Sequence, residues 1–299
     1  MTDVGGWTVT AAGLVLVLIA LRDIFHTIWH PGGRGGLTRR LMTAVWWVGR
    51  RTRRRGRLHH LSGPLAMVAV VFVWLTMIVL GWSLVYWPHL PESFVYSAGL
   101  DPSEHAGPLD AFYLSMVTLA TLGFGDIAPV ETWLRIAVAV EALIGFALLT
   151  AAVSWVLEVY PALTRRRSLA VRLAQLRKVD THALLRDGRS AIAPGLLLDL
   201  AATVAQLRGD LTQYAETYYF RDGDPEASLP TMFTVLLELA DEGLRSGDPD
   251  LRYAGELLRV SAEDYLRVID EVFLGTGGSP GDICAAYADD HRHASARSS

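Results

Sequence analysis

The sequence predicts an all-α membrane protein, with three transmembrane helices, a short re-entrant helix and a small helical domain behind them. Three observations support this fold class. Three apolar runs are long enough to cross a bilayer, which needs about 20 residues. A glycine-rich stretch, TLATLGFGDIAP, lies between the second and third runs. The charges are strongly segregated along a chain of 299 residues whose net charge is only −4.

The three apolar runs occupy residues 7–29, 65–87 and 133–160. The second contains no charge and ends with Trp82, Tyr86 and Trp87, a pattern typical of aromatic side chains at a membrane interface. The first has the length of a signal peptide, but no basic segment precedes it. The sequence LRDIFHTIWH follows its apolar part, where a small-residue cleavage site would be expected. We therefore expect the first run to be a retained helix.

The arginines predict the orientation of these runs. Residues 31–60 contain nine arginines and no acid, and residues 165–178 contain five arginines and one lysine, again without an acid. Basic segments beside membrane spans favour the cytoplasmic side. The connection at 88–110 has four acids and neither lysine nor arginine. These charges predict a plasma-membrane protein with its N-terminus outside and its C-terminus in the cytoplasm.

Residues 111–121 have helical character but are too short to span a bilayer. We interpret them as a half-helix that enters the membrane and returns through the glycines. Irregular backbone at membrane depth is tolerated only where protein buries it or where it lines a water-filled path. Alternate glycines permit a backbone whose carbonyls point in one direction. Rings of such carbonyls can replace the hydration shell of a cation.

Two other interpretations of the glycine stretch are weaker. A phosphate-binding loop is excluded, because the chain has no GxxxxGK[ST] or GxGxxG motif. An ordinary hairpin turn would not require a short helix before the glycines and an apolar run on either side. The combination of these features favours a pore.

Residues from about 65 to 160 resemble the pore module of tetrameric potassium channels, whose selectivity filter is usually written TVGYG. The corresponding residues here are Thr121, Leu122, Gly123, Phe124 and Gly125, followed by Asp126. Two of them, Leu122 and Phe124, depart from the family pattern. The missing hydroxyl at position 124 implies a less rigid filter. The resemblance implies K⁺ as the permeant ion, with no cofactor and no other metal.

The resemblance extends into the third apolar run. Arg135 and Gly145 lie ten and twenty residues after Gly125, and Gly145 corresponds to the gating hinge of the inner helix. A glycine that lets two helices pack closely is the alternative. Below it an inner gate is predicted, because an apolar constriction can close a pore by dewetting. Its residues recur at every fourth position: Leu149, Val153 and Leu157.

Glu141 lies inside the third apolar run, four residues before Gly145. An ionised carboxylate in hydrocarbon is costly, so such a residue usually faces the interior of a helix bundle. We expect Glu141 to bond to Ser115 or Thr118 of the half-helix and, with Thr118 and Asp126, to support the filter. Inward-rectifier-like channels resemble this arrangement. A packing carboxyl without a gating role is the alternative.

Charged residues also end the first apolar run. We interpret Arg22, Asp23 and His26 as residues that reach the inner interface or bond to neighbouring helices. A single arginine is not a voltage sensor. Cytoplasmic pH sensing is an alternative role for four histidines, because their ordinary pKa lies near physiological pH: His26, His30, His59 and His60.

The arginine cluster at residues 34–57 mixes basic and apolar residues, among them Leu37, Leu41, Trp46 and Val48. This composition is typical of a helix that lies on the inner leaflet. Anionic lipid headgroups are the expected partner. Nucleic acid is not favoured, because the cluster lies between two membrane spans.

The remaining chain predicts a helical cytoplasmic domain at 162–274, since apolar residues recur there at helical spacing between Gly/Pro/Asp-rich breaks. No GxGxxG motif for a nucleotide-binding regulatory domain is present. Residues 275–299 are expected to be disordered. Cys284, His291 and His293 are nominal metal ligands there, but a loose tail without a metal is the favoured interpretation.

The sequence therefore divides into an N-terminal helix at 1–30, a basic loop at 31–62, a pore module at 63–161, the helical domain and the tail. One filter segment cannot surround an ion, so we expect a homotetramer. No catalytic constellation appears, and an enzyme is not expected. A potassium-selective channel is the predicted function. The alternatives are a weakly selective cation channel and a membrane-anchored signalling scaffold whose pore is vestigial.

Overall fold

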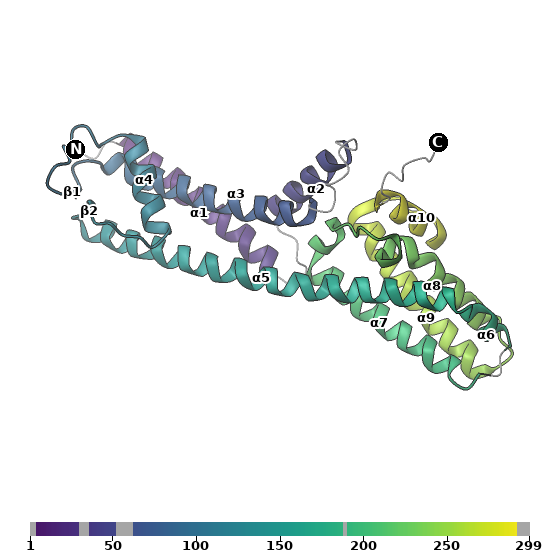
Figure 1. The fold of residues 1–299 in the computed structure, drawn as a ribbon. Helices are drawn as coiled ribbons and strands as arrows, with labels where there is room; N and C mark the ends of the chain where they lie inside the picture. The colour runs from purple at the N-terminus through teal and green to yellow at the C-terminus, as the bar shows by residue number, and fades with distance from the viewer. Residues whose placement is uncertain (1–3, 30–35, 52–61, 188–189, 292–299) are drawn as a thin grey trace, which may run out of the picture. The chain divides into compact units, whose positions relative to one another are not determined.

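A computed structural model of the chain describes residues 4–29, 36–51, 62–187 and 190–291 (Figure 1). The described part is all-α apart from two three-residue strands, as the sequence predicts. The long helices are α1 (Val4–Ile28), α2 (Gly36–Arg51), α3 (Ser62–Tyr86), α4 (Pro108–Leu119), α5 (Thr132–Lys178), α7 (Ala193–Gln213), α8 (Leu229–Leu244), α9 (Pro249–Ile269) and α10 (Pro280–His291).

Shorter elements join these helices. They are the 3-10 turn at Trp87–His89, strands β1 (Phe94–Tyr96) and β2 (Ile127–Pro129), helix α6 (Thr181–Asp187), the 3-10 turns at Ala215–Tyr219 and Pro225–Ala227, and a π-helical turn at Asp270–Leu274. The chain forms two compact units. The first comprises Met1–Leu41 and Ala66–Leu157, and the second comprises Met42–Leu65 and Glu158–Ser299.

Three helices are long and apolar enough to cross a membrane: Val4–Ile28, Gly63–His89 and Thr132–Lys178. They coincide with the three apolar runs of the sequence. Helix α5 continues without interruption for 47 residues, through Pro161, into the second arginine cluster. The arginines after the third run therefore prolong that helix and do not begin a new one.

Helix α1 packs along α3 through one face. Its buried residues recur every three or four positions and include Thr10, Gly13 and Val17. A Cβ atom on Gly13 would lie 2.4 Å from the carbonyl oxygen of Gly81 on α3, so only glycine permits this approach. Small residues at such crossings allow transmembrane helices to pack backbone against backbone.

Asp23 joins α1 to both α2 and α3. Its carboxylate accepts hydrogen bonds from the backbone N–H of Leu37 at 2.8 Å and of Thr38 at 3.2 Å. The Thr38 hydroxyl donates to it at 2.8 Å, and the indole N–H of Trp74 at 2.9 Å. The two amides are among those that the first turn of α2 leaves without an intrahelical acceptor. Asp23 therefore caps α2 from another helix, which is the bonding to neighbouring helices that the sequence suggested.

The aromatic residues at the end of α3 do not form the exposed interfacial belt that the sequence suggested. Tyr86 is fully buried, and Trp82 is nearly so. Only Trp87 is substantially exposed. The interpretation is wrong for Tyr86 and Trp82. Helix α3 is apolar on every side, so its sequence does not show which side chains face other helices.

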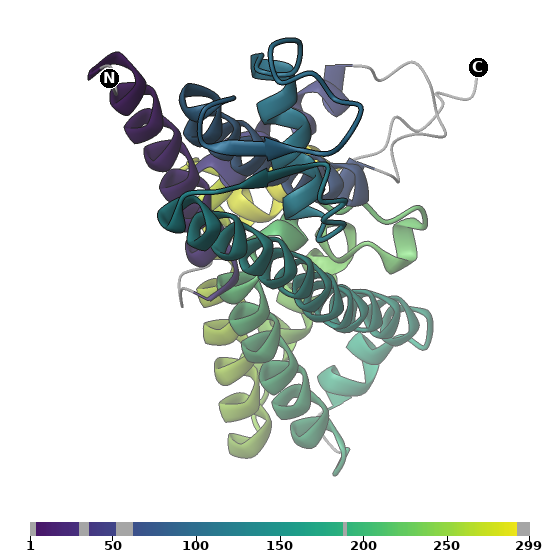
Figure 2. The same ribbon diagram turned by 90° about the vertical axis from the view of Figure 1, so that its left-hand side faces the viewer.

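The second unit contains α6–α10 together with α5 from Glu158 onward. Helices α7 and α9 lie side by side within it (Figures 1 and 2). The basic side chains of α5 are bonded to acids of this unit. The guanidinium of Arg165 forms a bidentate ion pair with the Asp210 carboxylate, with N–O distances of 2.7 and 2.8 Å. The Lys178 ammonium donates to the Glu226 carboxylate at 2.5 Å. The opposite charges of the two sequence segments are thus partly neutralised by ion pairs.

Trp46 on α2 does not face lipid. Its indole is buried in the second unit, where its ring centroid lies 5.8 Å from that of Tyr219 and 5.1 Å from that of His291. The prediction of an interfacial helix is therefore wrong for this tryptophan, although Trp47 and Val48 are exposed. The described residues do not include several residues of the predicted basic loop: His30, Arg34, His59, His60 and the arginines at positions 53, 54, 55 and 57.

The predicted disorder of residues 275–299 is wrong for α10. Cys284, Tyr287 and His291 of this helix are buried. The composition that suggested a loose tail conceals apolar residues at helical spacing. His293 lies outside the described residues, and among those that the structure does describe no three His, Cys, Asp or Glu side chains are grouped as metal ligands.

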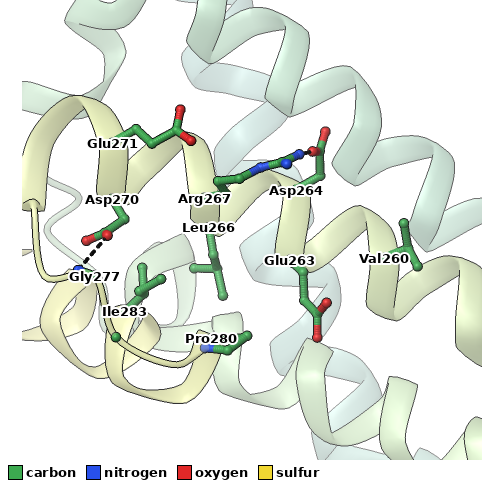
Figure 3. A pocket seen from close by; sticks show the side chains of 11 residues that line it. Val260, Glu263, Asp264, Leu266, Arg267, Asp270, Glu271, Gly277, Pro280 and Ile283 are labelled. Atoms are coloured by element: carbon green, nitrogen blue, oxygen red, sulfur yellow. Dashed lines mark hydrogen bonds and ion pairs between the residues drawn. The ribbon is translucent and has the colours of Figure 1, made fainter.

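An acidic hollow of about 530 Å³ lies beside α9 and the start of α10 (Figure 3). Three of its four carboxylates, those of Glu263, Asp264 and Asp270, have partners. Asp270 accepts hydrogen bonds from the Thr276 hydroxyl at 2.6 Å and the Gly277 amide at 2.9 Å, which hold its pKa below its usual range. Asp264 is paired with Arg267. The hollow is a structural feature of the loop between the two helices.

Replacing Gly13 with Ala should destabilise the protein, because the new Cβ meets backbone atoms that cannot rotate away. We expect a loss of about 2 kcal/mol in the free energy of unfolding. The matched control is Gly209→Ala on α7, where nothing lies within 4 Å of the new atom. That change should stabilise by about 0.5 kcal/mol. Thermal unfolding in detergent measures both, and equal shifts would contradict the close helix crossing.

His291 should make the protein less stable in acid. Burial lowers the pKa of His291 to about 4, whereas in the unfolded chain it is near 6.5. The unfolded state therefore takes up a proton first, and stability falls by about 3 kcal/mol as the pH drops from 6.5 to 4. His291→Gln keeps an N–H donor for the Tyr218 carbonyl, which lies 2.8 Å from Nε2. The variant should flatten the acid limb of a urea-unfolding series.

Glu216 provides a control of opposite sign for the same series. Burial raises the pKa of Glu216 to about 8. Its contribution to stability is therefore present below pH 4.5 and is lost as the pH rises through 8. Glu216→Gln should remove the fall in stability between pH 4.5 and 8. If both variants follow the wild-type curve, these two groups do not govern the pH dependence.

Candidate functional site

The glycine stretch has an alternating backbone. Thr121, Gly123 and Gly125 have φ angles of 57°, 53° and 73°, in the left-handed region. Leu122 and Phe124 between them are not among the residues with positive φ. Threonine is β-branched and rarely adopts this conformation, which costs on the order of 1–3 kcal/mol. Such strain at a non-glycine residue is typical of a functional site.

Helix α4 supports this backbone from behind. It begins at Pro108, where the Asp110 carboxylate accepts a hydrogen bond from the Gly107 amide at 3.0 Å. It ends at Leu119, immediately before the glycine stretch. The amides of Thr121 and Leu122 then donate to the Thr118 and Val117 carbonyls, each at 2.9 Å. The last carbonyls of α4 are thereby satisfied by the residues that follow them.

The side chains of the stretch are exposed in the single chain. Leu122 is 59% exposed and Phe124 is 65% exposed. Beside them an apolar groove of about 630 Å³ runs between α3 and α4, lined by residues that include Phe72, Phe112 and Met116. On a helix that is long and apolar enough to span a membrane, such a surface faces either lipid or another chain.

Asp126, directly after the last glycine, is fixed at both its backbone and its side chain. The hydroxyl of Tyr113 on α4 donates to its carboxylate at 2.7 Å, and its carbonyl accepts from the Ser97 amide at 2.8 Å. Strand β2 then pairs antiparallel with β1, with Ala128 opposite Val95. The sequence did not predict these strands, because three residues are too few to show alternation.

Glu131 fixes the start of α5. Its carboxylate accepts hydrogen bonds from the Ser93 hydroxyl at 2.9 Å and from the indole N–H of Trp133 at 2.6 Å. These bonds hold the pKa of Glu131 below its usual range. Trp133 also contacts His89 and Trp7, with ring centroids 4.9 and 5.6 Å away. The aromatic contacts connect α1 to the first turn of α5.

Glu141 joins three helices behind the glycine stretch. Its side chain is fully buried. The Ser115 hydroxyl on α4 donates to one carboxylate oxygen at 2.5 Å, and the Tyr86 hydroxyl on α3 donates to the other at 2.6 Å. Of the two partners expected from the sequence, Ser115 makes the bond. Thr118 is buried nearby on the same helix. The part that Glu141 plays in supporting a filter stays a prediction.

Gly145 lies against the end of α4. A Cβ atom at this position would be 2.0 Å from the Leu119 carbonyl oxygen, so any larger residue is excluded without movement of the backbone. Helix α5 is continuous on both sides of it. The contact is the close packing that the sequence left open as an alternative, and it accounts for a glycine here without a bend. A hinge at Gly145 stays a prediction.

The predicted gate residues lie on one exposed side of α5. Leu149, Val153 and Leu157 are 65%, 52% and 66% exposed. Trp155, between them in sequence, is buried, and its ring centroid lies 5.6 Å from that of Trp74. The structure thus separates an apolar side without partners in the single chain from a side packed on α3. Arg135, near the start of α5, is exposed as well.

Sequence reasoning missed Tyr86 and Tyr113, the two phenols that bind Glu141 and Asp126. Tyr113 lies 13 residues before its partner. The turn between them determines whether they meet, so spacing alone gives no signal. Tyr86 lies 55 residues before Glu141. The buried acid itself was the available signal, because such a carboxylate requires donors from neighbouring helices.

Removing the Glu141 carboxylate should destabilise the protein. Glu141→Ala leaves the buried hydroxyls of Ser115 and Tyr86 without their acceptor, which should lower the free energy of unfolding by about 3 kcal/mol. Glu141→Gln retains an acceptor and should cost about 1 kcal/mol. Thermal unfolding in detergent distinguishes them, with Glu104→Ala in an exposed loop as the control. The three-helix junction is wrong if Glu141→Ala behaves like that control.

Two comparisons with known proteins gave matches. Residues 68–160, which span the described α3 to α5 region, match the family described as Ion channel. The chain is 27% identical over 167 residues to the uncharacterized membrane protein YdjJ of Bacillus subtilis (strain 168). The similar region covers 55% of this chain and 48% of that protein, so the chain spans about half the length of this relative. No solved structure gives a significant match to this chain. These findings support an ion channel module within a membrane protein.

Proposed function

We propose that the protein is a potassium-selective channel whose filter is formed by Thr121, Leu122, Gly123, Phe124 and Gly125. The alternating backbone carries this proposal. Left-handed φ angles at every second residue are the conformation in which successive carbonyls can face the same side. Stacked carbonyls on one axis replace the hydration shell of K⁺. The strain at Thr121 is then part of a preorganised site.

A ring of identical chains follows from the same geometry. Each chain contributes one filter segment, and a single row of carbonyls cannot enclose an ion. Irregular backbone at membrane depth also needs protein or water around it. Neighbouring chains would cover Leu122, Phe124 and the groove between α3 and α4, all of which are exposed in the single chain. Four copies, as in the potassium channels that the module resembles, are the proposed assembly.

The proposed pore continues along α5. In a ring, its exposed residues Leu149, Val153 and Leu157 would face the axis and close it by dewetting. Asp126 with Tyr113, and Glu141 with Ser115 and Tyr86, would hold the filter from outside the ring. Gly145 would permit movement of α5 only together with the end of α4, because the two backbones touch there.

We propose that α1 begins outside a plasma membrane and that the second unit lies in the cytoplasm. The distribution of arginines supports this orientation. The arginine cluster at residues 34–57 would meet anionic lipid headgroups. Trp46 is excluded from that role, because it is buried in the second unit.

Weak selectivity is the second candidate function, and Phe124 is the observation that favours it. Its ring has no hydroxyl with which to fix the filter, and it is 65% exposed in the single chain. A filter held less rigidly would discriminate less between K⁺ and Na⁺.

Purified protein in liposomes with a potassium gradient should show potassium flux that barium blocks. Gly123→Ala should abolish this flux, because a side chain at a φ of 53° strains the backbone whose carbonyls would bind the ion. Leu157→Asp, which hydrates the proposed gate, should increase the flux and serves as an open control.

The outcomes separate the candidates. Comparable sodium flux would replace potassium selectivity with weak selectivity. No flux from Leu157→Asp would contradict a channel and favour a scaffold with a vestigial pore. Flux through Gly123→Ala equal to that of the wild type would contradict the assignment of the filter.

A further inference from the structure

The connection between α7 and α8 is buried to an unusual extent. Residues 216–222, with the sequence ETYYFRD, are all buried, although connections normally lie on the surface. The 3-10 turn at Ala215–Tyr219 forms its first half. We name residues 216–222 the buried loop. It lies within the second unit, which also contains the last part of α2, the first residues of α3 and α5 from Glu158 onward.

Arg166 of α5 binds the buried loop through the two terminal nitrogens of its guanidinium group. The side chain is 5% exposed. It donates to the carbonyl of Thr217, to the carbonyl of Phe220 at 2.7 Å and to the carboxylate of Asp222 at 3.1 Å. Arg167 donates to the same carboxylate at 2.5 Å. Hydrogen bonds made by a buried charge are the strong ones, and breaking them leaves unpaired polar groups.

Phe220 of the buried loop contacts the first residues of α3. A Cβ atom on Gly63 would lie 2.5 Å from the Phe220 ring, so this glycine lets the ring rest directly on the α3 backbone. The same ring meets Tyr160 of α5 edge to face, with centroids 6.4 Å apart. One phenylalanine therefore touches both α3 and α5.

The preceding tyrosines bind α2. The hydroxyl of Tyr219 lies 3.0 Å from that of Thr43. The indole N–H of Trp46 and the hydroxyl of Tyr218 donate to one oxygen of Asp290 on α10, at 3.1 and 2.6 Å. Three helices, α2, α3 and α5, thus meet one short loop of the second unit.

We infer that the buried loop is a restraint on the gate, in which Arg166 and Phe220 hold α5 at a fixed position against the start of α3. This inference rests on the proposed function. The stretch of α5 from Tyr160 to Arg166 cannot separate from the start of α3 unless the Phe220 ring leaves Gly63 or Arg166 releases the loop. The last proposed gate residue, Leu157, precedes Arg166 by nine positions on the same uninterrupted helix. Displacement of the buried loop would release α5 from the start of α3, while the pair between Arg165 and Asp210 of α7 would remain.

The test compares Arg166→Lys with Arg172→Lys in the full chain, reconstituted in liposomes. Lysine keeps the charge, but its single ammonium group cannot reach three acceptors in the geometry of a guanidinium. Arg172, also on α5, makes an exposed pair with Asp199 and is the matched control. Arg166→Lys should raise cation flux about tenfold, which corresponds to a shift of about 1.4 kcal/mol toward the open state. Arg172→Lys should leave the flux unchanged.

A second variant distinguishes loss of the restraint from unfolding of Arg166→Lys. Phe220→Leu keeps an apolar side chain but removes the ring from Gly63 and Tyr160, and it should raise the flux in the same direction. Gel filtration and circular dichroism establish that each variant is assembled and helical. Flux from both variants that equals the control, or falls below it, overturns the restraint.

The readouts for the two proposals are separate. The ratio of flux between Arg166→Lys and Arg172→Lys tests the restraint in whichever cation the pore passes, whereas the ratio of potassium to sodium tests the selectivity. If Leu157→Asp passes no cation, the proposal of a channel is wrong. Hydrogen exchange of residues 158–167 then tests the restraint without ion flux. Faster exchange in Arg166→Lys than in Arg172→Lys would support the restraint as a mechanical contact, and equal exchange would overturn it.

Discussion

The carboxylate of Glu141 is the interaction on which the arrangement of the first unit depends. Two hydroxyls, from Ser115 on α4 and Tyr86 on α3, bind its two oxygens at 2.5 and 2.6 Å. One turn further along α5, Gly145 meets the last carbonyl of α4. A buried carboxylate requires hydrogen-bond donors, which fixes the helices that supply them. The backbone contact at Gly145 prevents α4 from shifting along α5. These two points fix α4, and with it the strained backbone that begins at Thr121.

The sequence predicted the parts of this site that depend on local pattern. Apolar length identified the three long helices, and the glycines identified the irregular backbone between α4 and α5. Glu141 was recognised because an acid in an apolar run is costly. Its partner Tyr86 could not be recognised, since in sequence it is one more aromatic residue at the end of an apolar helix. Trp46 was assigned to lipid for a similar reason, because its neighbours in sequence are arginines.

The second unit illustrates another limit. Its helices were predicted from spacing, but α10 was not, because glycines and acids surround the few apolar residues that bury it. The contacts of the loop before α8 were equally hidden in the sequence. Tyrosine, phenylalanine and arginine in a connection suggest nothing in particular until Arg166 is found to donate to Phe220 and Asp222. Charge segregation along the chain was visible in the sequence, but the pairing that explains it requires the fold.

Asp23 makes α2 and α3 depend on the first helix. Helix α1 lies outside residues 68–160, which match the ion channel family. Its acid nevertheless completes the first turn of α2 and holds the indole of Trp74, which packs against Trp155. Cutting the gene before α2 would expose two backbone amides and strip a tryptophan of its acceptor. A variant of this chain without α1 would therefore need another N-terminal cap for α2.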